Sequence, residues 1–231
     1  MTLYLSRLTL NRDAGLAALA PLLDPPEPGR AADAHHRLIW SLFADCRDRD
    51  RDFLWRADGK GQFFTLSARM PTTSPLFLPP EVKEFAPALS VGNVLAFKLR
   101  ANATKTRKTG GQTKSGREHK SHDDVVMRKL PPKTGPRAEQ RMDIAQTEAS
   151  DWMTLQGTRV GFALRELVVE DYAVMALPGH VGKRKEQPQF GVLDLQGVIE
   201  VTDPDAFLPA LAKGFGRAKA FGCGLMLIRR G

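Results

Sequence analysis

The sequence has few cysteines and no long hydrophobic segment. Only Cys46 and Cys223 occur among its 231 residues, and neither belongs to a C-x-x-C motif. A disulfide framework or a cysteine-based zinc site is therefore not expected, and we assign no metal and no cofactor. No apolar run is long enough for a transmembrane helix, and residues 1–13 alternate too much for a secretory signal. These absences predict a cytoplasmic protein that does not contact a membrane.

Positive charge is concentrated in one part of the chain. Residues 100–141 contain twelve Lys or Arg and four Asp or Glu, a difference that equals the net charge of the whole protein, +8. Such a segment attracts phosphate backbones without regard to sequence. It contains few apolar residues between Thr104 and Asp124, which predicts disorder in the free protein. A solvated loop without a partner is the alternative interpretation.

The order of the predicted elements occurs twice along the chain. In the first half, a strand (2–10) and a helix (31–46) precede a hairpin (51–70) that turns at Asp58-Gly59-Lys60-Gly61, followed by a Pro-punctuated stretch with room for at most a short helix. In the second half, strands are predicted at residues 93–102, 162–178, 189–202 and 224–230, and helices at residues 136–156 and 203–213.

Two successive β-α-β-β-α-β units predict an α+β fold of tandem ferredoxin-like, RRM-like domains with a groove between them. We place the N-terminal domain at residues 1–90 and the C-terminal domain at residues 91–231. The second domain then contains the basic insertion, residues 104–137, and a glycine-rich loop, residues 214–224. Because RRM-like folds bind RNA and the insertion is basic, nucleic acid is the leading partner class.

The glycine-rich loop has two possible interpretations. Its glycines surround Arg217 and Lys219, but a helix is predicted before the loop and a strand after it, the reverse of the order in nucleotide-binding loops. A nucleotide-cofactor enzyme is therefore disfavoured. The loop is either a helix-to-strand turn with several positive φ angles, with Gly214 as the helix C-cap, or a site for another anion.

The five histidines differ in their predicted surroundings. At about 100° per residue on the first helix, His35 lies at the centre of an apolar stripe and predicts a core residue, whereas His36 lies at its edge beside Trp40. His119 and His122, in the basic insertion, are more typical of RNA contact or solvent exposure than of a metal site. His180 lies beside Lys183, Arg184 and Lys185, where phosphate contact is favoured over catalysis.

Three stretches together resemble the CasE family of CRISPR repeat-processing endoribonucleases, RAMP proteins of the type I-E system. They are FKLRANATK, the helix containing HHRLIW, and the ending GVIEVTDPDAFLPALAKGFGRAKAFGCGLMLI. The resemblance implies a double ferredoxin-like fold and metal-independent cleavage of precursor CRISPR RNA at the foot of a repeat hairpin. It also implies that the product is retained in a multi-subunit, RNA-guided surveillance complex, outside which we expect a monomer.

The resemblance places the catalytic histidine at His36. Cleavage without a metal needs a group that takes a proton from the ribose 2′-OH and one that protonates the 5′-oxygen, and histidine suits both. Asp33 stands where the family often has tyrosine, and it could orient His36 or be a helix N-terminal acid. Arg37 is the first candidate for stabilising charge on the phosphate, with a solvent-facing arginine as the alternative. Tyr172 is a further possible partner.

The expected RNA contacts extend beyond these residues. The glycine-rich ending is expected to pack under the RNA backbone, and the basic turn near residue 184 is expected to reach the hairpin stem. The predicted RNA-binding residues are Arg100, Lys105, Lys183, Arg184, Lys185, Gly214, Gly216, Arg217, Lys219, Gly222 and Gly224. A non-catalytic RNA-binding subunit of the same fold is the alternative function.

Overall fold

The computed structural model describes residues 2–230 except residues 45, 47–49, 113–115, 117, 133–134, 136 and 177–188. His180 and the basic turn with Lys183, Arg184 and Lys185 therefore lie outside the described residues. Among the helices that are described, none combines the length and the apolar character needed to cross a membrane.

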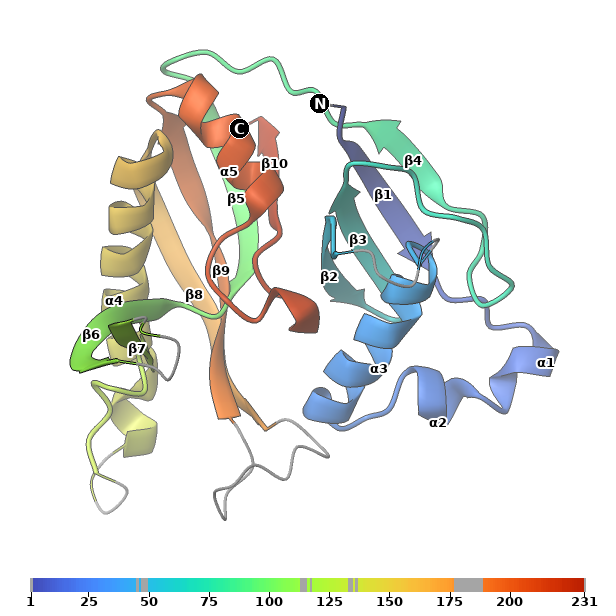
Figure 1. Cartoon of the computed structure of the whole chain (residues 1–231), viewed down its shortest axis with the longest axis horizontal. Helices are drawn as coiled ribbons and strands as arrows, with labels where there is room; N and C mark the ends of the chain where they lie inside the picture. The colour runs from blue at the N-terminus through green and yellow to red at the C-terminus, as the bar shows by residue number, and fades with distance from the viewer. Residues whose placement is uncertain are drawn as a thin grey trace.

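The chain forms two four-stranded antiparallel sheets that stand side by side (Figure 1). The first has the order β2-β3-β1-β4, and the second the order β10-β5-β9-β8. The first sheet consists of β1 (Tyr4–Thr9), β2 (Phe53–Gly59), β3 (Gln62–Ser67) and β4 (Glu81–Glu84). The second consists of β5 (Val94–Ala101), β8 (Phe162–Ala176), β9 (Gln189–Val201) and β10 (Met226–Arg230).

When the strands are numbered 1 to 4 within each half, both sheets have the spatial order 2-3-1-4, which runs from β8 to β10 in the second sheet. The second half has both expected helices, α4 (Arg137–Val160) and α5 (Pro204–Lys213). The first half has α3 (Pro28–Ser41), preceded by the short α1 (Ala14–Ala17) and α2 (Ala20–Leu23), but no helix between β3 and β4. The predicted tandem arrangement is therefore present, and a domain boundary at residue 90 stays a prediction.

Helix α3 begins earlier than its apolar spacing predicts. The Glu27 carboxylate accepts hydrogen bonds from the backbone N–H groups of Gly29 (3.1 Å) and Arg30 (3.2 Å), and Pro28 occupies the first turn. An N-cap acceptor followed by proline starts a helix irrespective of the apolar stripe further along. The helix ends at Ser41 rather than near Cys46, although Leu42 and Phe43 remain buried.

Each sheet has a core on its helix-covered face. In the first half, α3 packs on the sheet through buried residues that include Leu8, Leu38, Ile39, Phe53 and Phe63. In the second half, α4 and α5 cover a larger core that includes Phe97, Leu99, Trp152, Leu195 and Phe207. The burial of these side chains is the main contribution that stabilises each half.

The two halves contact each other through the start of β10 and the segment before it. Leu225 packs with Leu54 and Leu66 from the opposite face of the first sheet. Beyond this cluster, the short 3₁₀ helix η1 (Lys219–Phe221) contacts both α3 and β2. The indole Nε1 of Trp55 donates a hydrogen bond to the carbonyl of Ala220 at 3.2 Å, which holds η1 beside the first half (Figure 1).

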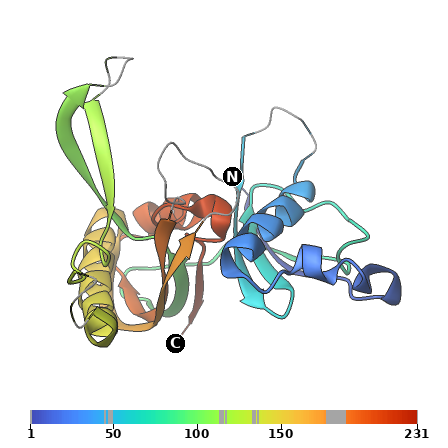
Figure 2. The ribbon, with the colours of Figure 1, turned by 90° about the horizontal axis from the view of Figure 1, so that it is seen from below.

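The basic insertion is not irregular over its described residues. It forms a two-stranded ribbon of β6 (Thr104–Gln112) and β7 (Glu118–Asp124), which projects from the second half in Figure 2. The prediction of disorder is wrong for these residues because backbone pairing and cross-strand side-chain contacts compensate for the small apolar content. The ion pairs Arg107–Asp123 (3.2 Å) and Lys108–Glu118 (3.1 Å) join its strands.

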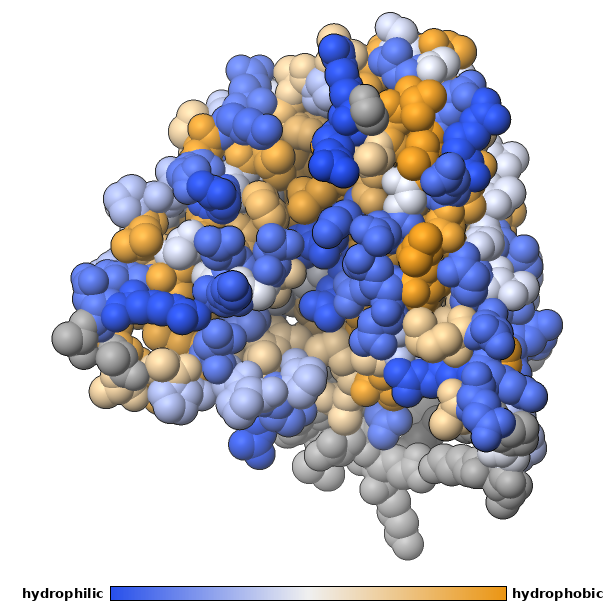
Figure 3. Space-filling view, turned by 180° about the vertical axis from the view of Figure 1, so that it is seen from behind, coloured by the Kyte–Doolittle hydropathy of each residue, from blue (hydrophilic) through white to orange (hydrophobic). Residues whose placement is uncertain are grey.

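The face of the second sheet opposite α4 and α5 is partly open. Ala96, Lys98, Gln196 and Val198 line a shallow hollow there, and Val168 is 53% exposed. In Figure 3, hydrophobic residues gather over the half of the molecule that contains this sheet, among hydrophilic ones. This surface is mixed in character, because Lys98, Arg229 and Glu166 line the hollow together with apolar residues.

Candidate functional site

His36 lies where α3 meets η1. Its ring centroid is 5.8 Å from that of Trp40 on the same helix and 6.3 Å from that of Phe221 on η1. Among the described residues, Nδ1 is buried and has no hydrogen-bond partner, so Nε2 is the nitrogen available for an external partner. The edge position predicted from helical spacing is therefore confirmed, and the ring faces the glycine-rich ending.

The surroundings of His36 favour its neutral form. Burial is the main cause that lowers the pKa of His36 below 6.5, and the positive charges of Arg51 and Arg37 lower it further. The Asp33 carboxylate acts in the opposite direction and raises the pKa. The imidazole is therefore mostly neutral at pH 7, as a group that accepts a proton must be.

Asp33 and Arg37 pair with each other. The Arg37 Nη2 lies 2.8 Å from the Asp33 Oδ2, and the Arg37 side chain is 78% exposed. Both residues line a hollow between α2 and α3, away from η1. Because α3 begins at Pro28, Asp33 is not in its first turn, and the interpretation as a helix N-terminal acid is wrong. No hydrogen bond joins Asp33 to His36 among the described residues, so Asp33 acts on His36 only through its charge.

His35 is a core residue, as its place on the apolar stripe predicts. It is 7% exposed, and its ring meets Phe63 edge-on at 4.8 Å between centroids. Its Nε2 lies 3.0 Å from Oδ1 of Asp24, in the turn before α3. Burial lowers the pKa of His35 and the Asp24 contact partly offsets this, so the ring serves the structure through its packing and the contact of Nε2 with Asp24.

Tyr172 is not near His36. Its side chain is fully buried in the second core, and its hydroxyl donates a hydrogen bond to Oδ1 of Asp124 at 3.1 Å. The guanidinium carbon of Arg141 lies 5.7 Å from the ring centroid. The suggestion that Tyr172 partners His36 is therefore wrong, because period-2 alternation on β8 turns this residue toward α4.

The four glycines of the loop are explained by backbone conformation and close packing. Gly214, Gly216, Gly222 and Gly224 all have positive φ, from 74° to 97°. A Cβ on Gly216 would lie 2.6 Å from the carbonyl oxygen of Asn102, and one on Gly222 would lie 3.1 Å from the Trp55 ring. Both interpretations of the loop require such a turn, and Gly214 does follow the last residue of α5.

Many of the loop amides are already used within the protein. The N–H groups of Gly214, Phe215, Arg217, Phe221 and Gly224 donate to backbone carbonyls at 2.7–3.1 Å. Free amides are what an anion-binding nest needs. Anion binding at this loop would therefore depend mainly on side chains.

Two cationic side chains extend from the loop. Arg217 is exposed, while its backbone N–H is bonded to the carbonyl of Asn102 at 3.1 Å. Lys219 is half-buried beside α3, and its Nζ donates to the carbonyl of Lys213 at 2.6 Å. Burial and the charges of Arg51 and Lys213 lower the pKa of Lys219, which is the response of a cation that lies among other cations.

The remaining predicted contacts lie farther from His36. Arg100 on β5 pairs with Asp194 at 3.1 Å, and Lys105 at the base of the ribbon lies 3.8 Å from Glu148 on α4. His119 and His122 on β7 contact the hydroxyls of Thr109 and Thr106 at 2.9 and 3.0 Å. Within the described ranges, no group of three or more metal-binding side chains occurs.

Comparison with known proteins agrees with these features. The sequence profile of the family described as "CRISPR associated protein" matches residues 3–230, which is nearly the whole chain. The chain belongs to the CRISPR-associated protein family. This confirms the resemblance on which the first assignment of His36 depends.

Individual relatives extend the comparison of this CRISPR-associated protein. It is 25% identical over 197 residues to "CRISPR system Cascade subunit CasE" of Escherichia coli K12, covering 83% of this chain and 88% of that protein. It matches Thermus thermophilus Cse3 "bound to an RNA representing a pre-cleavage complex" with a TM-score of 0.65 and 22% identity, covering 99% and 100% of the two chains. Cas6e from E. coli K-12 matches with a TM-score of 0.60, 21% identity and the same coverage. The tandem ferredoxin-like fold is confirmed.

Arg51 is the residue at this site that sequence reasoning missed. It precedes β2, is partly buried, and its charge acts on both His36 and Lys219. The flanking sequence, RDRDRDF, looks like an ordinary charged loop, in which no periodicity singles out one arginine. A more useful signal is its position two residues before Phe53, the first residue of the apolar strand FLW, because that strand packs against α3.

Proposed function

We propose that this protein is a metal-independent endoribonuclease that binds the stem-loop of CRISPR repeat RNA and cleaves precursor CRISPR RNA. The observation that carries the proposal is the neutral imidazole of His36, which lies against the glycine-rich ending and whose buried Nδ1 has no hydrogen-bond partner among the described residues. Family membership and the likeness to CasE support the substrate class. Histidine chemistry suffices for this reaction, so no metal is needed.

The proposed reaction begins with proton transfer from the ribose 2′-OH to Nε2 of His36. The 2′-oxygen then attacks the adjacent phosphorus and the bond from phosphorus to the 5′-oxygen breaks, leaving a 2′,3′-cyclic phosphate and a 5′-hydroxyl. The leaving 5′-oxygen takes a proton from protonated His36 or from water. Negative charge that develops on the phosphate needs nearby cations. We assign this role to Lys219, because η1 contacts α3, and not to Arg37, the earlier candidate, because Arg37 pairs with Asp33.

RNA binding would extend from the site along the basic residues. Arg217 and Lys219 would contact the strand near the cut, with the glycines shaping the loop that presents them. Lys183, Arg184 and Lys185 would contact the stem through its backbone and shape, because side chains cannot read the deep groove of A-form RNA. Arg100 and Lys105 are weaker candidates because Asp194 and Glu148 already contact them. Retention of the product in a surveillance complex is proposed from the likeness to a Cascade subunit.

A non-catalytic RNA-binding subunit is the second candidate. It is favoured by Asp33, which stands where the family often has tyrosine and is paired with Arg37 instead of His36. His36 then has no second proton-transfer group on α3. The same fold and the same basic residues, among them Arg217 and Lys219, would serve this function equally well.

One cleavage assay separates the two functions. The wild-type protein is incubated in EDTA with a stem-loop repeat RNA and with the same RNA carrying a 2′-deoxy sugar at the cut. We expect cleavage of the natural RNA to a cyclic phosphate product and complete survival of the deoxy RNA. Binding of both RNAs without cleavage would favour the non-catalytic subunit, and cleavage only on addition of Mg²⁺ would contradict the mechanism.

A further inference from the structure

Arg51 lies where α3, β2 and η1 converge. Alternate residues of a strand face the same side, so Phe53 and Trp55 of β2 form one row. The Phe53 ring packs 5.4 Å from the Trp40 ring on α3, and the Trp55 indole is bonded to Ala220 on η1. The row therefore faces α3 and η1, and Arg51, two residues before Phe53 where the chain enters β2, lies close enough for its charge to act on His36 and Lys219.

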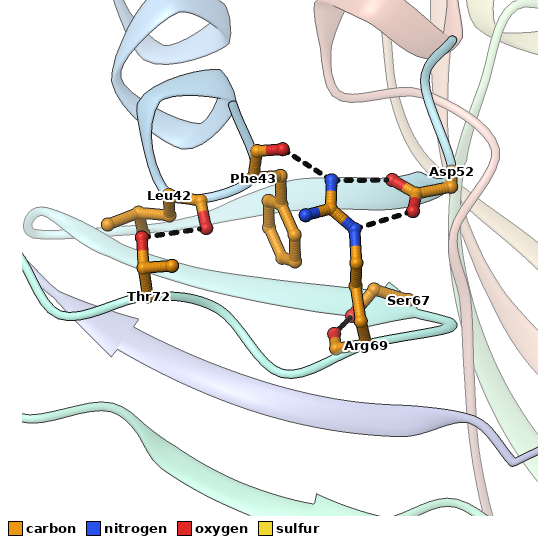
Figure 4. Close-up of polar contacts among 6 residues, drawn as sticks. All are labelled: Leu42, Phe43, Asp52, Ser67, Arg69 and Thr72. Atoms are coloured by element: carbon orange, nitrogen blue, oxygen red, sulfur yellow. Dashed lines mark hydrogen bonds and ion pairs between the residues drawn. The ribbon is translucent and has the colours of Figure 1, made fainter. Parts of the chain in front are cut away.

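Contacts around Asp52 fix this position (Figure 4). The Arg69 guanidinium binds the Asp52 carboxylate through Nε at 2.7 Å and through Nη2 at 3.3 Å, and Nη2 also donates to the carbonyl of Phe43. Thr72 donates to the carbonyl of Leu42 through its backbone N–H at 2.9 Å and its hydroxyl at 3.0 Å. The residue after Arg51 is thus tied to the end of α3, so Arg51 is held at a defined place.

Within the part of the chain that the structure describes, no carboxylate pairs with the Arg51 guanidinium, and the adjacent Asp52 is bound by Arg69. Burial is the cause that lowers the pKa of Arg51, with no acidic group acting against it. The Lys219 ammonium donates to the Lys213 carbonyl and, over the described ranges, has no carboxylate partner. Two partly desolvated cations beside one neutral histidine leave a local positive charge, which is costly unless an anion binds there.

We propose that Arg51 binds the phosphate whose ester bond is cut, together with Lys219, and is a catalytic residue of this enzyme. This inference rests on the endoribonuclease function proposed above and names a further residue of that site. When the 2′-oxygen attacks phosphorus and the 5′-oxygen leaves, the negative charge grows on the non-bridging oxygens. A planar guanidinium can donate two parallel hydrogen bonds to those oxygens.

Variants of Arg51 test the inference through cleavage. Arg51→Ala and Arg51→Lys are compared with the wild type in single-turnover cleavage of the stem-loop RNA, with Arg159→Ala on the exposed end of α4 as a matched control. We expect Arg51→Ala to cleave about 100-fold more slowly or worse, Arg51→Lys to recover part of the rate, and Arg159→Ala to match the wild type. Matching thermal unfolding curves establish that each variant folds. Cleavage by Arg51→Ala at the wild-type rate would overturn the inference and leave the endoribonuclease function intact.

Binding to the uncleavable 2′-deoxy RNA tests the same contact without catalysis. We expect the affinity of Arg51→Ala to depend less steeply on salt, with a slope smaller by about one, since one phosphate contact is lost. An unchanged slope overturns the inference. This measurement decides even if the wild type does not cleave, so failure of the phosphate contact is distinguishable from failure of the proposed function.

Discussion

The adjacent histidines of α3 differ in what their ring nitrogens meet. Nε2 of His35 is held by Asp24 inside the first core, whereas the His36 ring lies beside η1 and its buried Nδ1 has no hydrogen-bond partner among the described residues. Two residues with the same chemistry therefore have different functions because one step along a helix turns the side chain by about 100°. This distinction could be made from the sequence.

The charge environment of His36 predicts the pH dependence of cleavage. If His36 is the base, kcat/KM rises with pH until the imidazole of the free enzyme is neutral and then levels off. Burial and two arginines lower the pKa of His36, so we expect half of the maximum below pH 6.5. A pH series of kcat/KM measures this, and a midpoint above pH 7 would contradict the assigned environment.

The Asp33–Arg37 pair can shift that midpoint in either direction. Asp33 raises the pKa of His36 and Arg37 lowers it, so Asp33→Asn should move the midpoint down and Arg37→Gln should move it up. The shifts should have opposite signs and each should be under about one pH unit, since exposed charges are screened. NMR titration of the His36 ring in both variants provides the check. Shifts of the same sign would indicate a structural change instead of a charge effect.

At the scale of elements, the glycine-rich ending is a turn that joins α5 to β10 and carries η1. Its positive φ angles and close approaches hold Lys219 and Phe221 against α3 and β2. The helix-to-strand order and the Gly214 C-cap could be predicted from sequence. The internal use of the loop amides could not, because their acceptors lie partly on β5 and in the segment after it, more than a hundred residues away.

Substitution of Gly216 should destabilise the protein through both strain and overlap. It has φ +74°, and an added Cβ would lie 2.6 Å from the Asn102 carbonyl oxygen, so Gly216→Ala should lower the free energy of unfolding by about 2 kcal/mol or more. Gly59→Ala is the matched control, since Gly59 has φ +81° with open space around it. Urea denaturation compares them. Equal losses in the two variants would mean that the close approach to Asn102 contributes nothing.

Other element boundaries were set by contacts that periodicity does not contain. Helix α3 starts at Pro28 because Glu27 caps it, ahead of the apolar stripe. The ribbon of β6 and β7 was missed because its polar sequence lacks a buried face, and its pairing comes from cross-strand contacts such as Arg107–Asp123. Apolar patterns predict elements that pack on a core, and they say little about those that project from it.

For the whole molecule, the repeated order of predicted elements was enough to predict two similar sheets. Their mutual placement depends on a few residues, chiefly Leu54, Leu66 and Leu225, which no sequence pattern relates to one another. That placement brings α3 of the first half against η1 of the second, so the site forms only when the two halves of the chain pack together. Arg51 belongs to none of the three stretches that resemble the family, so those stretches do not single it out.

A buried arginine at the junction of the halves gives a test of that interface. Arg56 is 9% exposed, and its Nε and Nη1 atoms have no hydrogen-bond partner among the described residues. Burial lowers its pKa, while Asp194 of the other half raises it. Because an imperfectly paired buried charge contributes little stability, Arg56→Met should be neutral or should raise the free energy of unfolding by about 1 kcal/mol. A loss of more than about 2 kcal/mol in urea denaturation would show that Arg56 holds the halves together.

Single-turnover cleavage by His36→Ala measures whether the imidazole of His36 performs the chemistry. The variant is assayed in EDTA on stem-loop repeat RNA beside His119→Ala, which removes an exposed histidine from the ribbon. We predict that His36→Ala binds the RNA within a few-fold of the wild type and cleaves it at least about 1000-fold more slowly, while His119→Ala retains full activity. Cleavage by His36→Ala at a rate close to that of the wild type would mean that a group other than His36 performs the chemistry.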